Sequence, residues 1–220
     1  MPISCASWRF TSVWPCACNA GALEVRSAAA SLCGDGVIFM KLWLVRHAQP
    51  LIAPAVCYGA SDVAADASAT LQAAQALAQT LPAGMALVSS PLQRCERLAH
   101  CLRGLRPDFT YTTDARLAEM NFGSWEGQRW DAIAQADYDA WVADFAEHRF
   151  GGQESVSEFM RRVTCAWDEN QRQGLDAVWI THAGVIRAAS LLAQGVRQVT
   201  QAAQWPSDAP AFGGWRELQV

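Results

Sequence analysis

The stretch "LWLVRHAQP", residues 42–50, decides the fold. Four apolar residues run directly into Arg46 and His47, and Pro50 ends the run. A short apolar run closed by a turn signal is typical of a strand buried on both faces, as in a parallel sheet. Ligand sites in such sheets lie just beyond the carboxyl ends of the strands. Arg46 and His47 are therefore candidate site residues.

The sequence that follows alternates between short apolar runs and helical stretches. Strands are expected over residues 41–46, 85–89, 109–112 and 177–181. Helices are expected over residues 64–80, 91–103, 130–145, 155–172 and 184–193. This alternation predicts an α/β fold with helices on both faces of the sheet. Residues 205–220 are rich in turn residues and contain only a few strand-like ones.

The first 39 residues differ from the rest of the chain. They show neither helical nor strand periodicity, and Pro15 and Asn19 interrupt the apolar stretch that a signal peptide would need. Met40 stands directly before the first expected strand. We expect residues 1–39 to be a disordered extension or a misassigned start, and residues 40–220 to form one domain.

Composition and charge exclude several classes of protein. The chain has 220 residues, of which 51% are hydrophobic and 17% charged, and a net charge of −4. This balance is typical of a globular protein and provides no general basic surface for nucleic acid. No run approaches the roughly 20 apolar residues of a membrane span. We expect a cytoplasmic protein without nucleic-acid or membrane partners.

The eight cysteines and four histidines do not indicate a metal site. No cysteine pairs with a histidine at zinc-finger spacing, and the closest cysteine pair is CxC instead of CxxC. Reduced thiols are the expected state of the cysteines in a cytoplasmic protein. The sequence predicts neither a metal nor a cofactor.

Two further strand ends carry polar residues. Ser90 in "SSPLQR" is a good N-cap and the following proline suits a first helical position, which places Arg94 within one turn of the helix start. In "THAGVIRA", His182 stands where small residues open a helix, and the free N–H groups of a helix start favour an anion. Arginine forks and histidines at adjacent strand ends predict a pocket for one phosphoryl group.

Each fragment alone has a simpler interpretation. An Arg-His pair at a strand end is usually solvated. His182 could serve merely as a helix cap, and Arg94 could be a surface arginine. His100 and His148 stand in helical stretches without a motif and are interpreted as structural. The occurrence of all three clusters in order, each at a strand-to-helix boundary, favours a site.

Four segments resemble the signature blocks of a known family. "LVRHAQP", "SSPLQRCERLA", "LAEMNFGSWEGQ" and "THAGVIRA" are similar to those of the histidine phosphatase superfamily, which has the phosphoglycerate mutase-like fold. The resemblance implies a three-layer sandwich with a mostly parallel central sheet. Within the superfamily, "EMNFGSWEGQRWDAI" is most similar to alpha-ribazole phosphatases, which act late in cobalamin nucleotide-loop assembly, although broad-specificity bacterial relatives carry similar text.

The resemblance also implies residue roles. His47 would be the nucleophile that becomes a phosphohistidine, and Arg46, Arg94 and His182 would bind the phosphoryl group. Glu119 would be the general acid that protonates the leaving oxygen, without a metal or cofactor. Glu126 is a rival for this role, but Glu119 holds the matching motif position, so Glu126 is expected to support the loop.

The resemblance leaves several functions open. The expected function is hydrolysis of a small phosphomonoester, alpha-ribazole 5′-phosphate first, through a phosphohistidine. The alternatives are a broad-specificity phosphatase, a phosphoglycerate mutase-like enzyme, and a non-catalytic phosphate-binding or scaffold domain. Departures from the family pattern, such as Ala48 for a glycine and Leu98 for a threonine, leave the catalytic set intact and bear on the substrate. A homodimer is left open.

Overall fold

A central five-stranded sheet organises the protein. The structure is a computed structural model and describes residues 40–199 and 201–220. The strands follow the order β3-β2-β4-β1-β5 across the sheet. Their bounds are β1 Lys41–Arg46, β2 Ala86–Ser89, β3 Thr110–Thr113, β4 Ala177–Thr181 and β5 Trp215–Gln219. The first four are parallel, and β5 runs antiparallel to β1 at the edge. The predicted α/β class with a mostly parallel sheet is confirmed.

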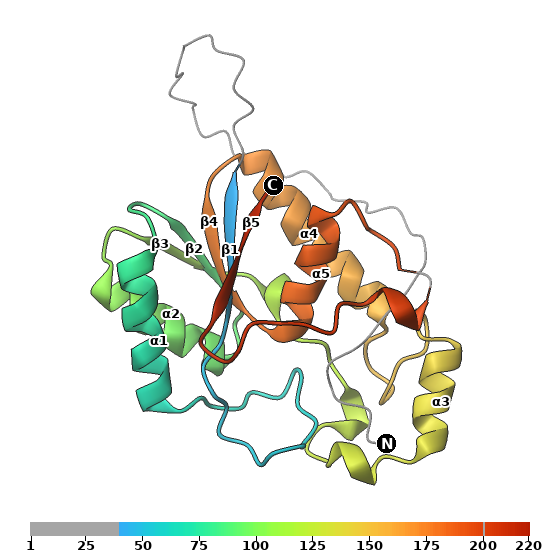
Figure 1. The fold of residues 1–220 in the computed structure, drawn as a ribbon. Helices are drawn as coiled ribbons and strands as arrows, with labels where there is room; N and C mark the ends of the chain where they lie inside the picture. Colours follow the sequence, from blue (N-terminus) through green and yellow to red (C-terminus); the bar gives the residue numbers. More distant parts are fainter. Residues whose placement is uncertain (1–39, 200) are drawn as a thin grey trace.

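Helices cover both faces of this sheet (Figure 1). Helices α1 (Ala67–Thr80) and α2 (Gln93–Leu105) lie on one face, and α4 (Val156–Gln173) and α5 (Ala183–Ala193) on the other. The short helix α3 (Gln135–Ala143) lies at the periphery. The predicted three layers are therefore confirmed.

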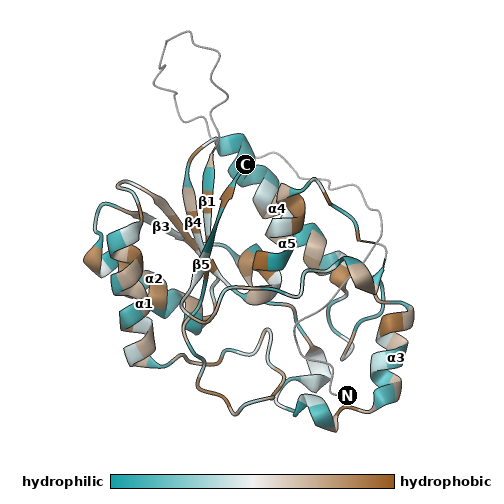
Figure 2. Ribbon diagram, in the orientation of Figure 1, coloured by the Kyte–Doolittle hydropathy of each residue, from teal (hydrophilic) through white to brown (hydrophobic). Residues whose placement is uncertain are grey.

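The alternation of side chains along β1 explains the two cores. Trp43 and Val45 pack into the cluster with α1 and α2, whereas Leu42 and Leu44 pack into the cluster with α4 and α5. Successive strand residues point to opposite faces, so an uninterrupted apolar run supplies both layers. Helices α1 and α4 carry both hydrophobic and hydrophilic residues, whereas β5 is mostly hydrophilic (Figure 2).

The helix expected over residues 130–145 is confirmed only over Gln135–Ala143, and its expected start is wrong. A 3-10 turn, Trp130–Ala132, is followed by α3, which begins at Gln135. Ile133 and Ala134 between them are extended, with ψ angles of 130° and 143°. The Trp130 N–H donates to the Ala55 carbonyl at 2.8 Å, and the Trp130 carbonyl accepts the Tyr138 hydroxyl at 2.7 Å. These backbone groups are thus satisfied outside a continuous helix.

Three further details differ from the sequence prediction. Residues 215–219 form β5, whose charged residues are typical of an edge strand and hide its strand pattern. Helix α2 begins at Gln93 with Leu92 as its N-cap, so the prediction of Ser90 as N-cap is wrong. Cys57, Cys95 and Cys101 are free thiols, but Cys165 is disulfide-bonded, contrary to the expectation of reduced thiols.

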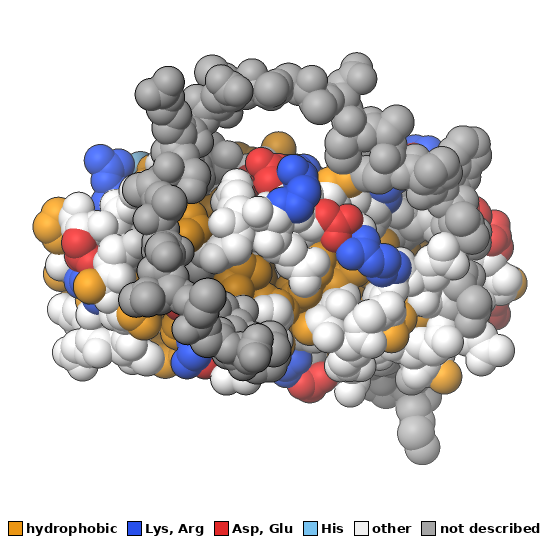
Figure 3. Space-filling view, turned by 90° about the horizontal axis from the view of Figure 1, so that it is seen from above, with side chains coloured by type: hydrophobic (Ala, Val, Ile, Leu, Met, Phe, Trp, Pro, Cys, Tyr) orange, Lys and Arg blue, Asp and Glu red, His pale blue; other side chains and the backbone are white. Residues whose placement is uncertain are grey.

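The structure also bears on the expectations for the N-terminal segment, for membrane spans and for surface charge. The expectation for residues 1–39 lies outside the described residues. Among the helices that the structure describes, none is long and apolar enough to cross a membrane. On the face seen from the top of Figure 1, basic and acidic side chains lie next to one another with hydrophobic side chains between them (Figure 3).

Candidate active site

The register of the sheet brings three polar strand ends together. Arg46 pairs with Thr181 across β1 and β4, and Ser89 of β2 pairs with Ile180 of β4. The ladder continues past the strand ends, because the His47 N–H donates to the Thr181 carbonyl at 3.0 Å. The imidazole rings of His47 and His182 consequently lie 5.2 Å apart, centroid to centroid.

His47 is held as a neutral imidazole. Its side chain is buried, and its Nδ1 lies 2.7 Å from the Ala48 carbonyl oxygen. Because a carbonyl oxygen only accepts, Nδ1 carries the proton and Nε2 keeps its lone pair. Burial, followed by the positive charge of Arg94, lowers the pKa of His47 to about 3. An unprotonated Nε2 at neutral pH is the state that a nucleophile requires.

The two predicted arginines flank the histidines. Arg46 donates from Nη1 to the Pro210 carbonyl at 3.0 Å. Arg94 is fully buried and donates from Nη1 to the Ser61 carbonyl at 2.7 Å and from Nη2 to the Gly59 carbonyl at 2.6 Å. The Nε atoms of both arginines are buried and have no hydrogen-bond partner within the described part of the chain. Buried donors of this kind suit an anion.

His182 stands at the junction of β4 and α5. It is the N-cap residue of α5, and its Nε2 lies 2.8 Å from the Ser90 hydroxyl and 3.4 Å from the Cys95 sulfur. Burial, then the charge of Arg94, lowers the pKa of His182 well below its ordinary value. Burial also raises the pKa of the Cys95 thiol, so Cys95 is a neutral neighbour of His182.

Glu119 reaches the same helix start from the loop after β3. Its Oε2 accepts the Gly184 N–H at 3.1 Å, and its Oε1 accepts the Met120 N–H at 3.2 Å. Arg162 on α4 fixes the loop, since its Nη2 donates to the Glu119 carbonyl at 3.0 Å and its Nη1 to the Ala118 carbonyl at 2.6 Å. The carboxylate is thereby fixed at the opening of α5.

Glu126, the rival acid, holds another loop. It accepts hydrogen bonds from the backbone N–H groups of Ala60, Ser61 and Phe122 and from the Ser61 hydroxyl. Burial alone would raise the pKa of Glu126, but these hydrogen bonds outweigh it and lower the pKa. Through the 59–61 turn Glu126 also supports the carbonyls that Arg94 contacts.

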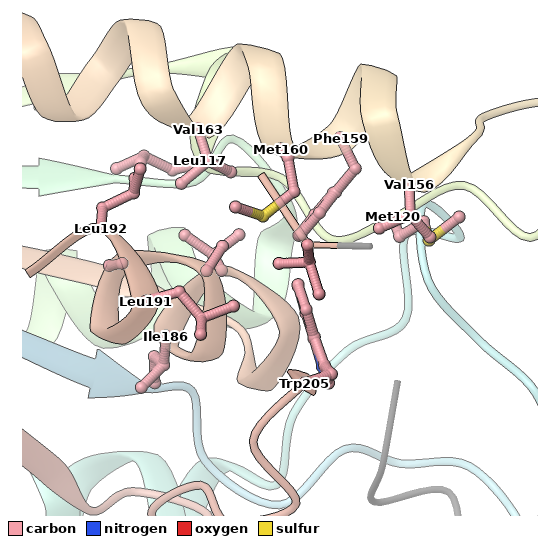
Figure 4. Close-up of a cluster of buried hydrophobic side chains, with 14 of the residues drawn as sticks. Leu117, Met120, Val156, Phe159, Met160, Val163, Ile186, Leu191, Leu192 and Trp205 are labelled. Carbon is pink, nitrogen blue, oxygen red and sulfur yellow. The ribbon is translucent and has the colours of Figure 1, made fainter. Parts of the chain in front are cut away.

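A cavity of roughly 270 Å³ opens beside these residues. Arg46, His47, Glu119, Gly184 and Arg187 form its polar part. The remaining wall is mostly apolar and aromatic: Ala55, Val56, Tyr58, Met120, Phe122, Trp130, Val156, Phe159, Ala183 and Trp205. Figure 4 shows Met120, Val156, Phe159 and Trp205 within a hydrophobic cluster that continues between α4 and α5. The core of the protein thus supplies the apolar wall.

Comparison with known proteins agrees with this arrangement. A family model of the histidine phosphatase superfamily (branch 1) matches residues 42–208. The chain belongs to this superfamily. A relative from Hydrogenobacter thermophilus TK-6, named "Putative phosphoserine phosphatase 2", is 26% identical over 162 residues, which cover 71% of this chain and 79% of the relative. The chain is thus a phosphatase enzyme of the superfamily.

Solved structures of similar fold include two phosphatases. A mycobacterial glucosyl-3-phosphoglycerate phosphatase matches with a TM-score of 0.66 and 22% identity, covering 82% of this chain and 90% of that one. A protein described as "a putative alpha-ribazole-5'-P phosphatase" from Escherichia coli K-12 matches with a TM-score of 0.68 and 20% identity, with the same coverages of 82% and 90%. Both similarities show the phosphoglycerate mutase-like fold.

In this histidine phosphatase the five predicted site residues lie around one point. Arg46, His47 and Glu119 line the cavity, whereas Arg94 and His182 are buried behind its wall. Their assigned roles remain predictions.

The sequence patterns did not single out Arg187 or the aromatic residues of the wall as site residues. Arg187 lies one turn beyond Ala183 on α5, within the block that carries the resemblance, so its position was the available signal. Phe122 and Trp130 lie in the quoted segment "EMNFGSWEGQRWDAI", so the resemblance was their available signal, whereas Tyr58 and Trp205 lie outside the quoted segments and had none.

Proposed function

We propose that this protein hydrolyses a phosphomonoester through a phosphohistidine on His47, with alpha-ribazole 5′-phosphate as the substrate. In the first step the His47 Nε2 attacks phosphorus, the bond from phosphorus to the ester oxygen breaks, and Glu119 gives its proton to the departing oxygen. In the second step water attacks phosphorus, gives a proton to Glu119, and releases His47 and orthophosphate. Arg46 and Arg94 offset the negative charge of the phosphoryl oxygens throughout.

The observation that supports the proposal is the convergence of five groups at one edge of the sheet. A neutral buried imidazole lies beside two arginines whose Nε donors have no partner among the described residues, and a carboxylate shares its cavity. Phosphoryl transfer needs mainly positioning and positive charge, together with an acid for a poor leaving group. A scaffold domain needs neither a nucleophile with a free lone pair nor an adjacent acid.

The apolar wall supports the choice of substrate. Alpha-ribazole carries a flat benzimidazole on its ribose, and the aromatic side chains of Tyr58, Phe122 and Trp130 line the cavity. Phosphoserine, suggested by the Hydrogenobacter relative, carries an ammonium group as well as a carboxylate. Arg187 would suit the carboxylate. The ammonium group would need an acidic partner, and Glu119, already assigned as the general acid, is the one acidic residue among the described residues that line the cavity. A nucleoside-like leaving group therefore fits the wall better.

A matched pair of substrates tests this proposal. Ribose 5-phosphate has the same leaving oxygen as alpha-ribazole 5′-phosphate but lacks the base. Burial of a flat apolar ring should raise kcat/KM for the ribazole ester by about 10- to 100-fold. 3-Phosphoglycerate and phosphoserine should both be poorer substrates than the ribazole ester.

One variant shows whether the wall causes the preference. Trp130 is half-buried and lines the cavity, so Trp130→Ala should reduce the preference for the ribazole ester and leave ribose 5-phosphate almost unchanged. Equal kcat/KM for the two esters in the native protein would instead support a broad-specificity phosphatase. A higher value for phosphoserine would support the function named for the relative.

A further inference from the structure

The ring of Phe212 contacts two of the predicted site residues, Arg46 and His47. Its ring lies against the Arg46 guanidinium, with the Arg46 Cζ atom 3.9 Å from the ring centroid. The same ring lies 5.5 Å from the His47 imidazole, centroid to centroid, at an interplanar angle of 40°. A guanidinium at this distance over an aromatic face is attracted by the ring quadrupole.

The backbone fixes Phe212 in this place. The ladder between β1 and β5 continues beyond the strands, where the Arg46 N–H donates to the Gly214 carbonyl at 2.9 Å. The Gly213 N–H then donates to the carbonyls of Arg46 and His47, at 3.2 and 3.0 Å. Gly213 has a φ of +75°, a left-handed conformation that favours glycine and turns the chain at this point. The preceding Pro210 accepts the Arg46 Nη1 hydrogen bond.

We propose that Phe212 is a positioning residue for phosphoryl transfer, which orients the Arg46 guanidinium toward the phosphoryl group beside His47. This role rests on the proposed function of the same site. Phe212 is not among the residues that line the cavity, so it acts through Arg46 and His47 and not by touching the substrate. Together the ring and the Pro210 carbonyl hold the guanidinium from two directions.

The consequence concerns affinity for the phosphoryl group. Arg46 has one backbone acceptor at Nη1 and a buried Nε without a partner in the described residues. Without the ring, the guanidinium would rotate about its side-chain torsions and lose the orientation that a bidentate contact needs. Loss of the ring should therefore weaken binding of the phosphoryl group, whatever leaving group the phosphorus carries.

The test measures binding of orthophosphate itself by calorimetry, together with kcat/KM for 4-nitrophenyl phosphate. Phe212→Leu keeps an apolar side chain but removes the ring face, and should raise the dissociation constant of orthophosphate by about 2- to 30-fold. Phe212→Tyr keeps the ring and should restore the native value to within about twofold. The value of kcat/KM should fall with Phe212→Leu by at least the same factor.

A second variant keeps the test decisive if Phe212→Leu does not fold. Pentafluorophenylalanine at position 212 keeps the shape of the ring and reverses its quadrupole, so it should weaken orthophosphate binding in the same direction. Native affinity in the pentafluoro variant, or in Phe212→Leu where that variant folds, would overturn the proposal.

The matched control is Phe109→Leu. The ring centroid of Phe109 lies 4.3 Å from the Cζ of Arg106 in another cation–π pair. Phe109 stands just before β3, at the edge of the sheet opposite β5. It should leave orthophosphate affinity unchanged, and an equal loss there would mean general loosening and overturn the proposal. A native protein that binds orthophosphate but forms no phosphohistidine would contradict the proposed function. The orthophosphate affinities of the Phe212 variants would still test whether the ring positions Arg46.

Discussion

The carboxylate of Glu119 occupies the space that a side chain on residue 184 would need. A Cβ on Gly184 would lie 2.3 Å from the Glu119 Oε1, well inside contact distance, while the Gly184 N–H donates to the Glu119 Oε2 at 3.1 Å. The first turn of α5 therefore holds the predicted general acid both by a hydrogen bond and by the absence of a side chain.

Gly184→Ala should accordingly displace Glu119 without removing it. Because a misplacement of about 1 Å can cost about 10²-fold in rate, we expect a loss of that order in kcat for an alkyl phosphate. Steady-state kinetics with ribose 5-phosphate measures this loss. Gly104→Ala is the matched control, since a Cβ at this glycine in α2 meets no atom of residues 40–199 and 201–220 within 4 Å, and it should retain native kinetics. Native kinetics in Gly184→Ala would show that Glu119 tolerates displacement.

Glu119→Gln should reduce activity more on esters whose leaving group needs a proton than on esters whose leaving group does not. An alkyl alkoxide must be protonated as it departs, whereas an activated aryl phosphate leaves as the anion. We expect turnover of the alkyl ester to fall by about 10²- to 10⁴-fold. Formation of the phosphoenzyme from the aryl ester, followed as the initial burst, should slow far less. Equal losses on both would mean that Glu119 positions the phosphoryl group and that the proton has another source.

His47→Ala should abolish turnover and leave the fold intact. Within the described part of the chain the side chain makes one hydrogen bond, to the adjacent Ala48 carbonyl, so its removal should not disturb the strand ladder of β1. Native protein quenched with denaturant during turnover should carry acid-labile phosphate on His47, which mass spectrometry of alkaline digests can locate. Phosphate on another residue, or turnover by the variant, would contradict the mechanism.

The buried His47 also makes stability depend on pH. In the unfolded chain a histidine takes up a proton near pH 6.5, but in the folded protein the pKa of His47 is about 3. Between these values the unfolded state binds one more proton, so the free energy of unfolding falls as the pH is lowered. From pH 7.5 to 5.0 this histidine should account for a loss of about 2 kcal/mol.

Denaturant unfolding at the two pH values tests this expectation. His47→Gln should show a smaller loss of stability on acidification than the native protein, by about 2 kcal/mol. His182, whose pKa is lowered in the same way, should still contribute to the remaining loss. The exposed His100 provides the control, and His100→Gln should keep the native difference. An unchanged difference in His47→Gln would mean that His47 is protonated in the folded protein.

The sequence by itself determined the framework. The apolar run of β1 and the uninterrupted run of β4 are local patterns, and a strand buried on both faces requires such a run at every position. Because the carboxyl ends of parallel strands meet at one edge, the motifs after these strands could be placed together before any contact was known. Arg46, His47 and His182 lie where that argument placed them.

Only the tertiary structure decided the parts that depend on contacts between distant segments. Strand β5 forms because β1 offers it a free edge, and its own charged residues gave little sign of a strand. Phe212 enters the site because that antiparallel pairing returns the chain to the end of β1. Trp130 is separated from helix α3 because Ile133 and Ala134 are extended and the Tyr138 hydroxyl donates to the Trp130 carbonyl. Periodicity reports which face of an element is buried, but it does not report which remote backbone group or ring will meet it there.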